Sequence, residues 1–280
     1  MGSGKVIRLT DDEFIRLCTL MKQEFGIDLS KKRVLIEYRL LNELKSLELN
    51  DYSSYLKCLR DDESGNLKAT MIDCLTTNYT YFLREESHFD YILKKILTKI
   101  PKNQHYTIWV AGCSSGQECY TLAMKIAWAR YYEGIDLPDV SIVATDISKK
   151  MLQLAKAGEY SLDQLSRLPE AMQRAFCKVI DDKKFIINKE KLPPITFKYQ
   201  NLMDEFYRDS FDLIMCRNVM IYFDDEIRKK ILANLALALH EHGYLVLGHV
   251  EVMPIDNNVF TSCGASIYQK IMNKQQGERK

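Results

Sequence analysis

The stretch "WVAGCSSGQECYTLA", residues 109–123, passes from an apolar run through a corner of small residues into a helix-like pattern. Gly112, Ser114, Ser115 and Gly116 leave room beside the backbone that larger side chains would fill. A corner of this kind lets a ligand approach the backbone, but it also occurs as a tight connection that binds nothing. The stretch therefore predicts a strand, a turn and a helix, and it leaves the ligand open.

The sequence around this corner is typical of an α/β fold. From about residue 107, helix-like stretches alternate with the apolar runs "TIWVAG", "VSIVATD", "ITFKYQN", "FDLIMCRN" and "YLVLGH". The alternation predicts a parallel sheet with helices on both faces. The later segment "VFTSCGASIYQKI" predicts two further strands around Gly264, and "KKFIIN" indicates a small insertion near residues 160–195.

The first 75 residues carry helical signals and almost no strand signal. Thr10 and Glu13 in "TDDEF" have the spacing of a capping box, which predicts the start of a helix. Within "SKKRVLIEYRLLNELKSL", four residues at helical spacing are predicted to form a buried stripe: Val34, Tyr38, Leu41 and Leu44. The opposite face begins basic, and from the pattern alone such a face is more often merely solvated than a binding surface.

Length and composition fit two domains of a soluble protein. The chain has 280 residues, 46% hydrophobic and 28% charged, and no apolar run approaches the roughly 20 residues of a membrane span. The opening "MGSGKVIRLT" lacks the apolar core of a signal peptide. We therefore expect a cytoplasmic protein without direct membrane insertion. The formal net charge of +1 gives no overall field for nucleic acid.

The eight cysteines are scattered, without a C-x-x-C pair, and several stand inside apolar runs. They are predicted to be reduced and mostly buried. Cys113 and Cys119 flank the glycine corner, but no histidine or further cysteine stands at ligand spacing beside them. No metal site is expected.

In open α/β sheets, ligands bind beyond the carboxyl ends of the strands. The candidates that follow the apolar runs are Glu118, Asp146, Gln200, Asn201, Leu202, Arg217, Asn218 and Tyr222. Asp146, which closes "VSIVATD", can accept hydrogen bonds from both hydroxyls of a ribose. It can equally serve as a partner for the N-terminus of the following helix, and Asp146 alone does not decide between these roles.

The glycine corner lacks the features of a phosphate cradle. It has neither a complete G-x-G-x-x-G nor a G-x-x-x-x-G-K-[ST], and no lysine or arginine stands inside it. A ribose-binding acid beside such a corner points to a nucleoside cofactor without a phosphate, of which S-adenosylmethionine is the common example. A methyltransferase is therefore the leading hypothesis. The segment "CLTTNYTYFLREESHF", rich in polar and aromatic residues around Arg84, either folds over the ligand edge or is an ordinary connection.

These motifs, in this order, resemble the chemotaxis receptor glutamate methyltransferases of the CheR type. The resemblance covers nearly the whole chain: "FGIDLSKKRVLIEYRL", "TTNYTYFLRE", "AGCSSGQECYTLAM", "ATDIS", "AGEYS", "NL", "CRNVMIYFD", "GYLVLGH" and "GASIYQK". It implies a Rossmann-like S-adenosylmethionine-dependent methyltransferase sheet with a small inserted subdomain, preceded by a small all-α N-terminal domain. The implied boundaries are 5–75 for the helical substrate-recognition domain, 76–91 for a linker that contributes to the cofactor site, and 92–280 for the methyltransferase domain.

The resemblance also implies roles for individual residues. With Gly112 of the corner, the site for S-adenosylmethionine and its product S-adenosylhomocysteine would be lined by Asn78, Thr80, Arg84, Glu118, Asp146, Asn201, Leu202, Arg217 and Asn218. Tyr222 would stand near the transferred methyl group, Arg84 would hold the carboxylate of the substrate or of the cofactor, and both would be catalytic residues. The implied partner is the cytoplasmic helical region of chemotaxis receptors, docked through Lys31, Lys32, Arg33 and Arg39.

The sequence departs from the family pattern at Tyr79, at Cys119 and at Val250, none of which is an expected cofactor-binding group. Two other functions stay open. One is a catalytically silent regulator that binds S-adenosylmethionine or S-adenosylhomocysteine, and the other is a methyltransferase acting on another protein or on nucleic acid. Nucleic acid is disfavoured because "RNVMIY" is not an N-P-P-Y motif and no basic groove is visible.

Overall fold

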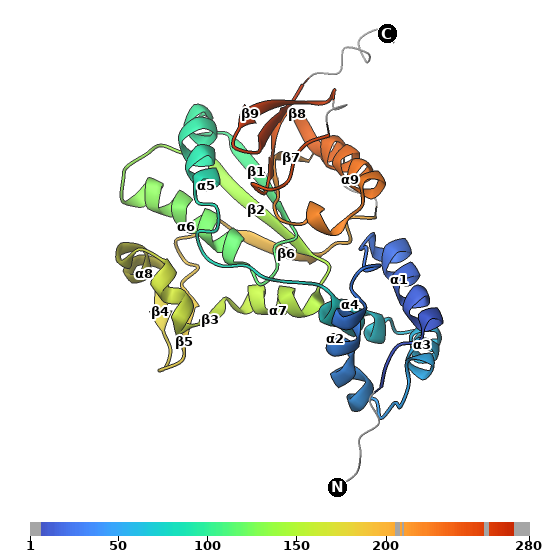
Figure 1. The fold of residues 1–280 in the computed structure, drawn as a ribbon. Coiled ribbons are helices and arrows are strands. Elements are labelled where there is room, and N and C mark those ends of the chain that lie inside the picture. The colour runs from blue at the N-terminus through green and yellow to red at the C-terminus, as the bar shows by residue number, and fades with distance from the viewer. Residues whose placement is uncertain (1–6, 205–207, 209, 255–257, 272–280) are drawn as a thin grey trace. The chain divides into compact units, whose positions relative to one another are not determined.

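The computed structural model describes residues 7–204, 208, 210–254 and 258–271, and it divides the chain into two compact units (Figure 1). The helical unit runs to Thr77 and also holds Tyr222–Ile227. The sheet unit holds Asn78–Ile221 and continues from Arg228. Most of the segment expected to be a linker, 76–91, therefore folds as part of the sheet unit.

In its described residues the helical unit contains four complete helices: α1 (Asp11–Phe25), α2 (Arg33–Ser46), α3 (Tyr52–Asp61) and α4 (Asn66–Leu75). The predicted capping box is confirmed, because the Thr10 hydroxyl accepts from the Glu13 amide and the Glu13 carboxylate accepts from the Thr10 amide. Gly26, with φ of +73°, ends α1 in the left-handed conformation that glycine adopts without strain. Tyr222–Ile227 joins this unit through a bridge between Ile27 and Phe223.

The buried stripe predicted for α2 is wrong at Val34 and Tyr38 and correct at Leu44. Val34 is 76% exposed and Tyr38 is 77% exposed, whereas the helix buries Ile36, Leu40 and Leu44. Both sets of residues recur at helical spacing, so the periodicity predicts the helix correctly without identifying the face that meets the other helices. The exposed face of α2 consequently carries apolar side chains beside its basic start.

The sheet unit is built on a seven-stranded sheet, counted over the described residues, in the order β6-β2-β1-β7-β8-β10-β9. Five strands are parallel: β1 (His105–Ala111), β2 (Asp139–Asp146), β6 (Ile195–Tyr199), β7 (Phe211–Cys216) and β8 (Leu239–Leu247). The predicted pair around Gly264, β9 (Phe260–Gly264) and β10 (Ile267–Lys270), closes one edge in antiparallel pairing. The predicted parallel sheet and its two final strands are confirmed.

Helices cover both faces of this sheet. The helical elements that connect or precede its strands are α5 (Ser87–Tyr91), η1 (Ile92–Ile96), η2 (Leu97–Lys99), α6 (Gln117–Tyr131), α7 (Lys149–Ala157), η4 (Met220–Tyr222) and α9 (Asp225–Ala238). From β1 the chain crosses to β2 in one direction, and from β7 it crosses to β8 in the other. Right-handed crossovers in opposite directions put their helices on opposite faces, and Figure 1 shows α6 and α9 on the two sides of the sheet. The direction of winding reverses between β1 and β7, which is where ligands bind in such sheets.

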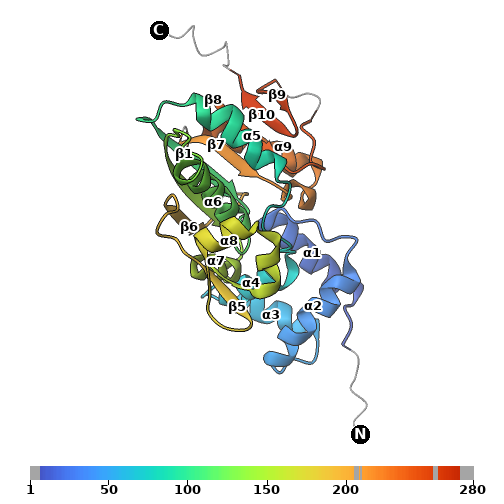
Figure 2. The same ribbon diagram turned by 90° about the vertical axis from the view of Figure 1, so that its left-hand side faces the viewer.

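The predicted insertion is a second, three-stranded sheet of β3 (Glu159–Ser161), β5 (Lys184–Ile187) and β4 (Cys177–Val179), in the order β3-β5-β4. It comes with η3 (Leu162–Arg167) and α8 (Glu170–Phe176). Phe176 and Phe185 pack with Tyr120 and Met124 of α6 in one buried cluster, so the insertion packs against that helix, and Figure 2 shows α8 near α6.

Two other expectations can be compared with the structure. Only Cys113, Cys119 and Cys216 are buried, so the expectation of mostly buried thiols is wrong, and all eight are free. Among the residues that the structure describes, no helix is both long enough and apolar enough to cross a membrane.

Candidate functional site

The glycine corner brings the ends of β1 and β2 together. The amides of Gly112 and Cys113 both donate to the Thr145 carbonyl, at 2.8 and 2.9 Å. Gly112 has φ of +77°, and a Cβ atom built on it would lie 2.5 Å from Cγ2 of Val219. Glycine is therefore required here both by backbone conformation and by the close packing of the loop after β7.

Asp146 organises this corner. It is 6% exposed; its Oδ2 accepts from the Ser114 amide at 2.7 Å and its Oδ1 from the Ser148 amide at 2.8 Å. Ser148 in turn caps α7 by accepting from the Met151 amide. The contact with the start of α7 was one of the two roles that the sequence left open.

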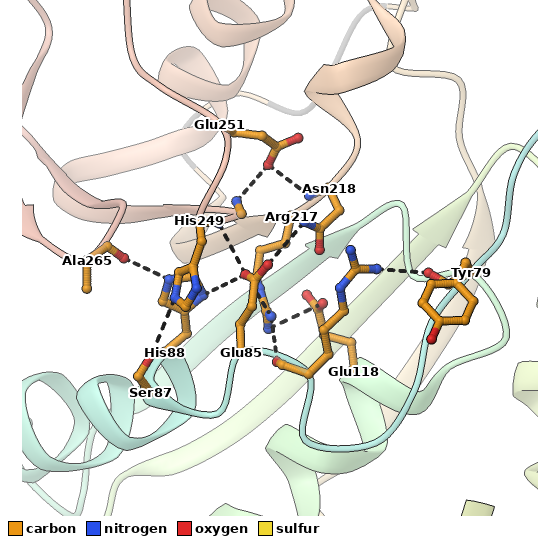
Figure 3. Close-up of polar contacts among 12 residues, drawn as sticks. Tyr79, Glu85, Ser87, His88, Glu118, Arg217, Asn218, His249, Glu251 and Ala265 are labelled. Atoms are coloured by element: carbon orange, nitrogen blue, oxygen red, sulfur yellow. Dashed lines mark hydrogen bonds and ion pairs between the residues drawn. The ribbon is translucent and has the colours of Figure 1, made fainter.

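Arg217, directly after β7, is the buried centre of the site (Figure 3). Its Nη2 donates to the Arg84 carbonyl at 2.6 Å and to Oε2 of Glu85 at 3.1 Å. Its Nη1 lies 3.4 Å from Oε2 of Glu118, and its guanidinium stacks on Phe89 at 5.1 Å. One side chain thus connects the strand end to the segment 78–86 and to α6.

Two donors of this guanidinium, Nε and Nη1, are buried without a hydrogen-bond partner. The contact with Glu118 is an ion pair by distance rather than a hydrogen bond. Burial raises the pKa of Glu118 above its ordinary value, and the Arg217 cation opposes that rise. A guanidinium with unused donors beside a buried carboxylate fits a ligand that carries a carboxylate and an ammonium group, which is the amino-acid end of S-adenosylmethionine.

Glu251 links the end of β7, which carries Arg217 and Asn218, to the end of β8. Its carboxylate is 5% exposed and accepts from the amides of Gly248, Asn218 and Met220 at 2.6–2.8 Å. Asn218 has φ of +58° and donates from its side chain to Oε1 of Glu85 at 3.2 Å. The sequence did not single out Glu251, although the acid stands four residues after the β8 run.

Arg84 lies among aromatic rings of the segment 78–86. Its Nη1 donates to the Tyr79 carbonyl at 2.8 Å. Its guanidinium lies 6.0 Å from the ring centre of Tyr79 and 5.8 Å from that of Tyr81, and Arg167 of the insertion covers Tyr81 at 4.6 Å. Cation–π contacts of this kind help to hold Arg84 in place, and no ion pair to it occurs within the part of the chain that the structure describes.

The remaining predicted cofactor residues line the same edge of the sheet or the segment that folds onto it. The Asn78 carbonyl accepts from the Ser114 hydroxyl at 3.1 Å. Asn201 and Leu202 are buried directly after β6, where the Gln200 amide donates to the Asp146 carbonyl. Thr80 is half-buried, and the structure brings no polar partner to it among the described residues.

The expected docking residues and Tyr222 belong to the helical unit. Tyr222 donates its hydroxyl to the Thr77 carbonyl at 3.1 Å, and Nζ of Lys32 lies 5.9 Å from the centre of its ring. Arg33 donates to the Leu9 carbonyl, and Arg39 donates to the carbonyls of Leu75 and Thr76. The two arginines therefore have structural contacts, whereas Lys31 and Lys32 are exposed.

Next to Arg217 lies a group of residues that the sequence did not suggest: Glu85, His88 and His249. His88 is fully buried, and its Nε2 lies 2.7 Å from the Ala265 carbonyl. Burial and the nearby Arg217 cation lower the pKa of His88 to about 4, so the ring is neutral at physiological pH. Glu85 and His88 are three residues apart, but His249 is distant in the sequence, so no local spacing could reveal the group.

Two family profiles match the chain. "CheR methyltransferase, all-alpha domain" matches residues 12–76, and "CheR methyltransferase, SAM binding domain" matches residues 78–269. A chemotaxis protein methyltransferase of Borreliella burgdorferi is 38% identical over 90% of this chain and 92% of its own length. Chemotaxis protein methyltransferase 1 of Vibrio cholerae is 32% identical over 95% of this chain and 98% of its own length. The chemotaxis protein methyltransferase of Salmonella typhimurium is 33% identical over 94% of this chain and 91% of its own length.

Proposed function

The chain belongs to the CheR family of methyltransferases, and we propose that it transfers a methyl group from S-adenosylmethionine to glutamate side chains of chemotaxis receptors. The observation that carries the proposal is the match along both domains to proteins named chemotaxis protein methyltransferase. Methylation of receptor glutamates serves sensory adaptation. The substrate would be the cytoplasmic helical region of the receptor, and the enzyme would act in the cytoplasm.

The buried edge of the sheet supports the choice of cofactor. Arg217 offers two unused donors for a carboxylate, and Glu118 offers an acceptor for an ammonium group. Asp146 stands where the architecture commonly binds ribose hydroxyls. We assign cofactor binding to these residues together with Asn78, Thr80, Arg84, Gly112, Asn201, Leu202 and Asn218. The cofactor supplies an electrophilic methyl group on a sulfonium.

The acceptor needs no general base. A glutamate side chain is ionised at neutral pH, so its oxygen is already a nucleophile. The protein has to align that oxygen and to strip water from it, because hydration masks the carboxylate charge. Arg84, held by Tyr79 and Tyr81, can orient a carboxylate by charge-assisted hydrogen bonds. For Tyr222, whose hydroxyl donates to the Thr77 carbonyl within the helical unit, the catalytic role rests on the family resemblance.

The proposal is tested by incubating the full chain with methyl-labelled S-adenosylmethionine and a cytoplasmic receptor fragment. We expect label on the fragment that is released by mild base, because carboxyl esters hydrolyse there and methylamines do not. A fragment with its acceptor glutamates changed to alanine is the matched control and should stay unlabelled. Cofactor binding without transfer would indicate a silent regulator, and base-stable label would indicate a different acceptor.

A further inference from the structure

Glu85, His88 and His249 bring three metal-ligating side chains to one place on the sheet unit, with their ligand atoms all within 4.8 Å of one another. They come from the segment before α5, from α5 itself and from the loop after β8. Figure 3 shows the two imidazoles beside the Glu85 carboxylate. The ring centres of His88 and His249 are 4.5 Å apart, and the rings are nearly perpendicular.

His88 has the environment of a metal-binding histidine. Its Nε2 lies 2.7 Å from the Ala265 carbonyl, which can only accept, so the hydrogen sits on Nε2 and Nδ1 carries the lone pair. A backbone carbonyl on the far nitrogen is the usual support of a metal-binding imidazole. Ala265 is held in the left-handed region at φ of +51°, in the turn between β9 and β10. The fold therefore fixes both the tautomer and the direction of the ring.

The Nδ1 atom of His88 is fully buried and has no hydrogen-bond partner. It lies 3.5 Å from Oε2 of Glu85, so two atoms with lone pairs face each other. That arrangement is unfavourable unless a cation lies between them. For a tetrahedral centre with Zn–N and Zn–O bonds of about 2.0–2.2 Å, the nitrogen and oxygen ligands are about 3.3–3.5 Å apart, which matches the observed separation.

From this geometry we infer that Glu85, His88 and His249 form a binding site for one divalent transition-metal ion of the Zn²⁺ class. Two imidazoles and one carboxylate are the ligands that such ions prefer, and they leave a fourth position open to water. His249 is exposed, and its only side-chain hydrogen bond among the described residues is a 3.4 Å contact with the Ser87 hydroxyl. Its ring can therefore turn toward the ion.

Arg217 limits the affinity of this site. Its Nη2 contacts the same Oε2 atom of Glu85 at 3.1 Å, and the His249 amide donates to that atom at 3.3 Å, so the ion must share the oxygen with both donors. Repulsion between the two cations weakens binding, and we expect micromolar rather than nanomolar affinity. The shared oxygen also makes the metal site a neighbour of the proposed cofactor site, although the inference does not depend on the proposed function.

The test is calorimetric titration of the full chain with ZnCl₂, alongside titration with CoCl₂ followed by visible absorption. We expect one Zn²⁺ to bind wild type, and the affinity to fall at least about tenfold in His249→Ala. His249 is exposed, so His249→Ala should fold. His88→Gln, which changes the buried ligand, is the second variant and should also lower the affinity for zinc. His105→Ala is the matched control, because His105 makes an exposed pair with Asp139 that can also attract metal.

Cobalt identifies the ligand type. Bound to the proposed group, Co²⁺ should show ligand-field bands of a nitrogen and oxygen site, without the intense ultraviolet band of thiolate coordination. These bands should be lost in His249→Ala and retained in His105→Ala. Equal zinc affinity in wild type and His249→Ala would overturn the inference, and so would a cobalt spectrum dominated by thiolate ligands.

Discussion

The Nη1 atom of Arg217 lies 3.4 Å from Oε2 of Glu118, and both side chains are largely buried at the carboxyl edge of the sheet. Burial raises the pKa of Glu118, and the Arg217 cation only partly offsets that rise. Keeping Glu118 ionised at neutral pH therefore costs stability, and a ligand with an ammonium group would gain a partner there.

Glu118→Gln should lower the affinity for the cofactor and raise the stability of the folded protein relative to wild type near neutral pH. A carboxyl group with a raised pKa in the folded state binds its proton more tightly there than when unfolded. Its stabilising contribution is present at low pH and is lost as pH rises through the folded pKa. The variant does not titrate, so its melting temperature should gain on wild type as pH rises from about 4 to 8, while its cofactor affinity falls.

Thermal melts across this pH range, with calorimetry of S-adenosylhomocysteine, check both parts. Glu190→Gln, at an exposed position of the sheet unit, is the matched control. If the melting temperature of Glu118→Gln falls relative to that of wild type as pH rises, the raised pKa of Glu118 is contradicted.

Asp146→Ala should weaken cofactor binding about ten- to a hundredfold, or by about 1.5–3 kcal/mol, the scale of hydrogen bonds to a charged group. Ser148→Ala separates the two roles of this region, because it removes the cap of α7 and leaves the Asp146 carboxylate in place. Ser148→Ala, the control, should lose about 1 kcal/mol of folding stability and keep the wild-type dissociation constant for the cofactor. An unchanged constant in Asp146→Ala would show that the acid only orders the corner.

Glu251→Ala should destabilise the sheet unit by about 3 kcal/mol or more, because two buried amides and one part-buried amide lose their acceptor at once. Glu251→Gln keeps one carbonyl oxygen and should cost less. Urea unfolding midpoints measure both changes, and Glu241→Ala, which removes only a half-exposed partner of Lys270, should stay within about 1 kcal/mol of wild type. If Glu251→Ala lowers the urea unfolding midpoint only slightly, water replaces the carboxylate as the acceptor for these amides.

Arg84→Ala should lower methyl transfer sharply while the melting temperature stays within a few degrees of wild type. The side chain makes one hydrogen bond and two ring contacts, so few interactions are lost. Arg174→Ala, which breaks an exposed pair with Glu170, is the control for loss of charge. If Arg84→Ala unfolds early and its folded fraction keeps full activity, the residue is structural.

The sequence predicted the elements whose signals are local. Alternating apolar runs identified the five parallel strands, and the small residues from Gly112 onward identified the turn, because strand burial and backbone freedom depend on nearby residues. For α2, Val34 and Ile36 begin two competing stripes, and only contacts with other helices decide which one is buried. Local periodicity contains no information on those contacts.

The sequence predicted the site residues that lie at strand ends, and it did not predict those that are brought together from distant parts of the chain. Arg217 follows β7 and Asp146 is the last residue of β2, so the rule for strand ends found them. Glu251 is important because it binds amides at the ends of two strands, and His88 because a turn 177 residues away presents a carbonyl to it. Such roles follow from tertiary packing, which no spacing in the sequence encodes.

The basic start of α2 is expected to dock the receptor, and Lys31 with Lys32 is the pair to reverse. Arg33 and Arg39 donate to backbone carbonyls, so changing them would disturb the helical unit as well as its charge. Lys31→Glu/Lys32→Glu should raise the Michaelis constant for the receptor fragment and leave cofactor affinity unchanged. The acidic receptor helices that carry the target glutamates would be repelled by the reversed charge.

Salt provides the second readout, because exposed charge pairs are screened beyond about 10 Å at 0.1 M ionic strength. Wild type should lose receptor affinity as salt is added, whereas the double variant should respond less. Lys57→Glu, an exposed change on α3 of the same unit, is the matched control and should behave as wild type. Equal Michaelis constants for wild type and the double variant across a salt series would exclude the start of α2, and the insertion at residues 160–195 would then be the surface to test for docking.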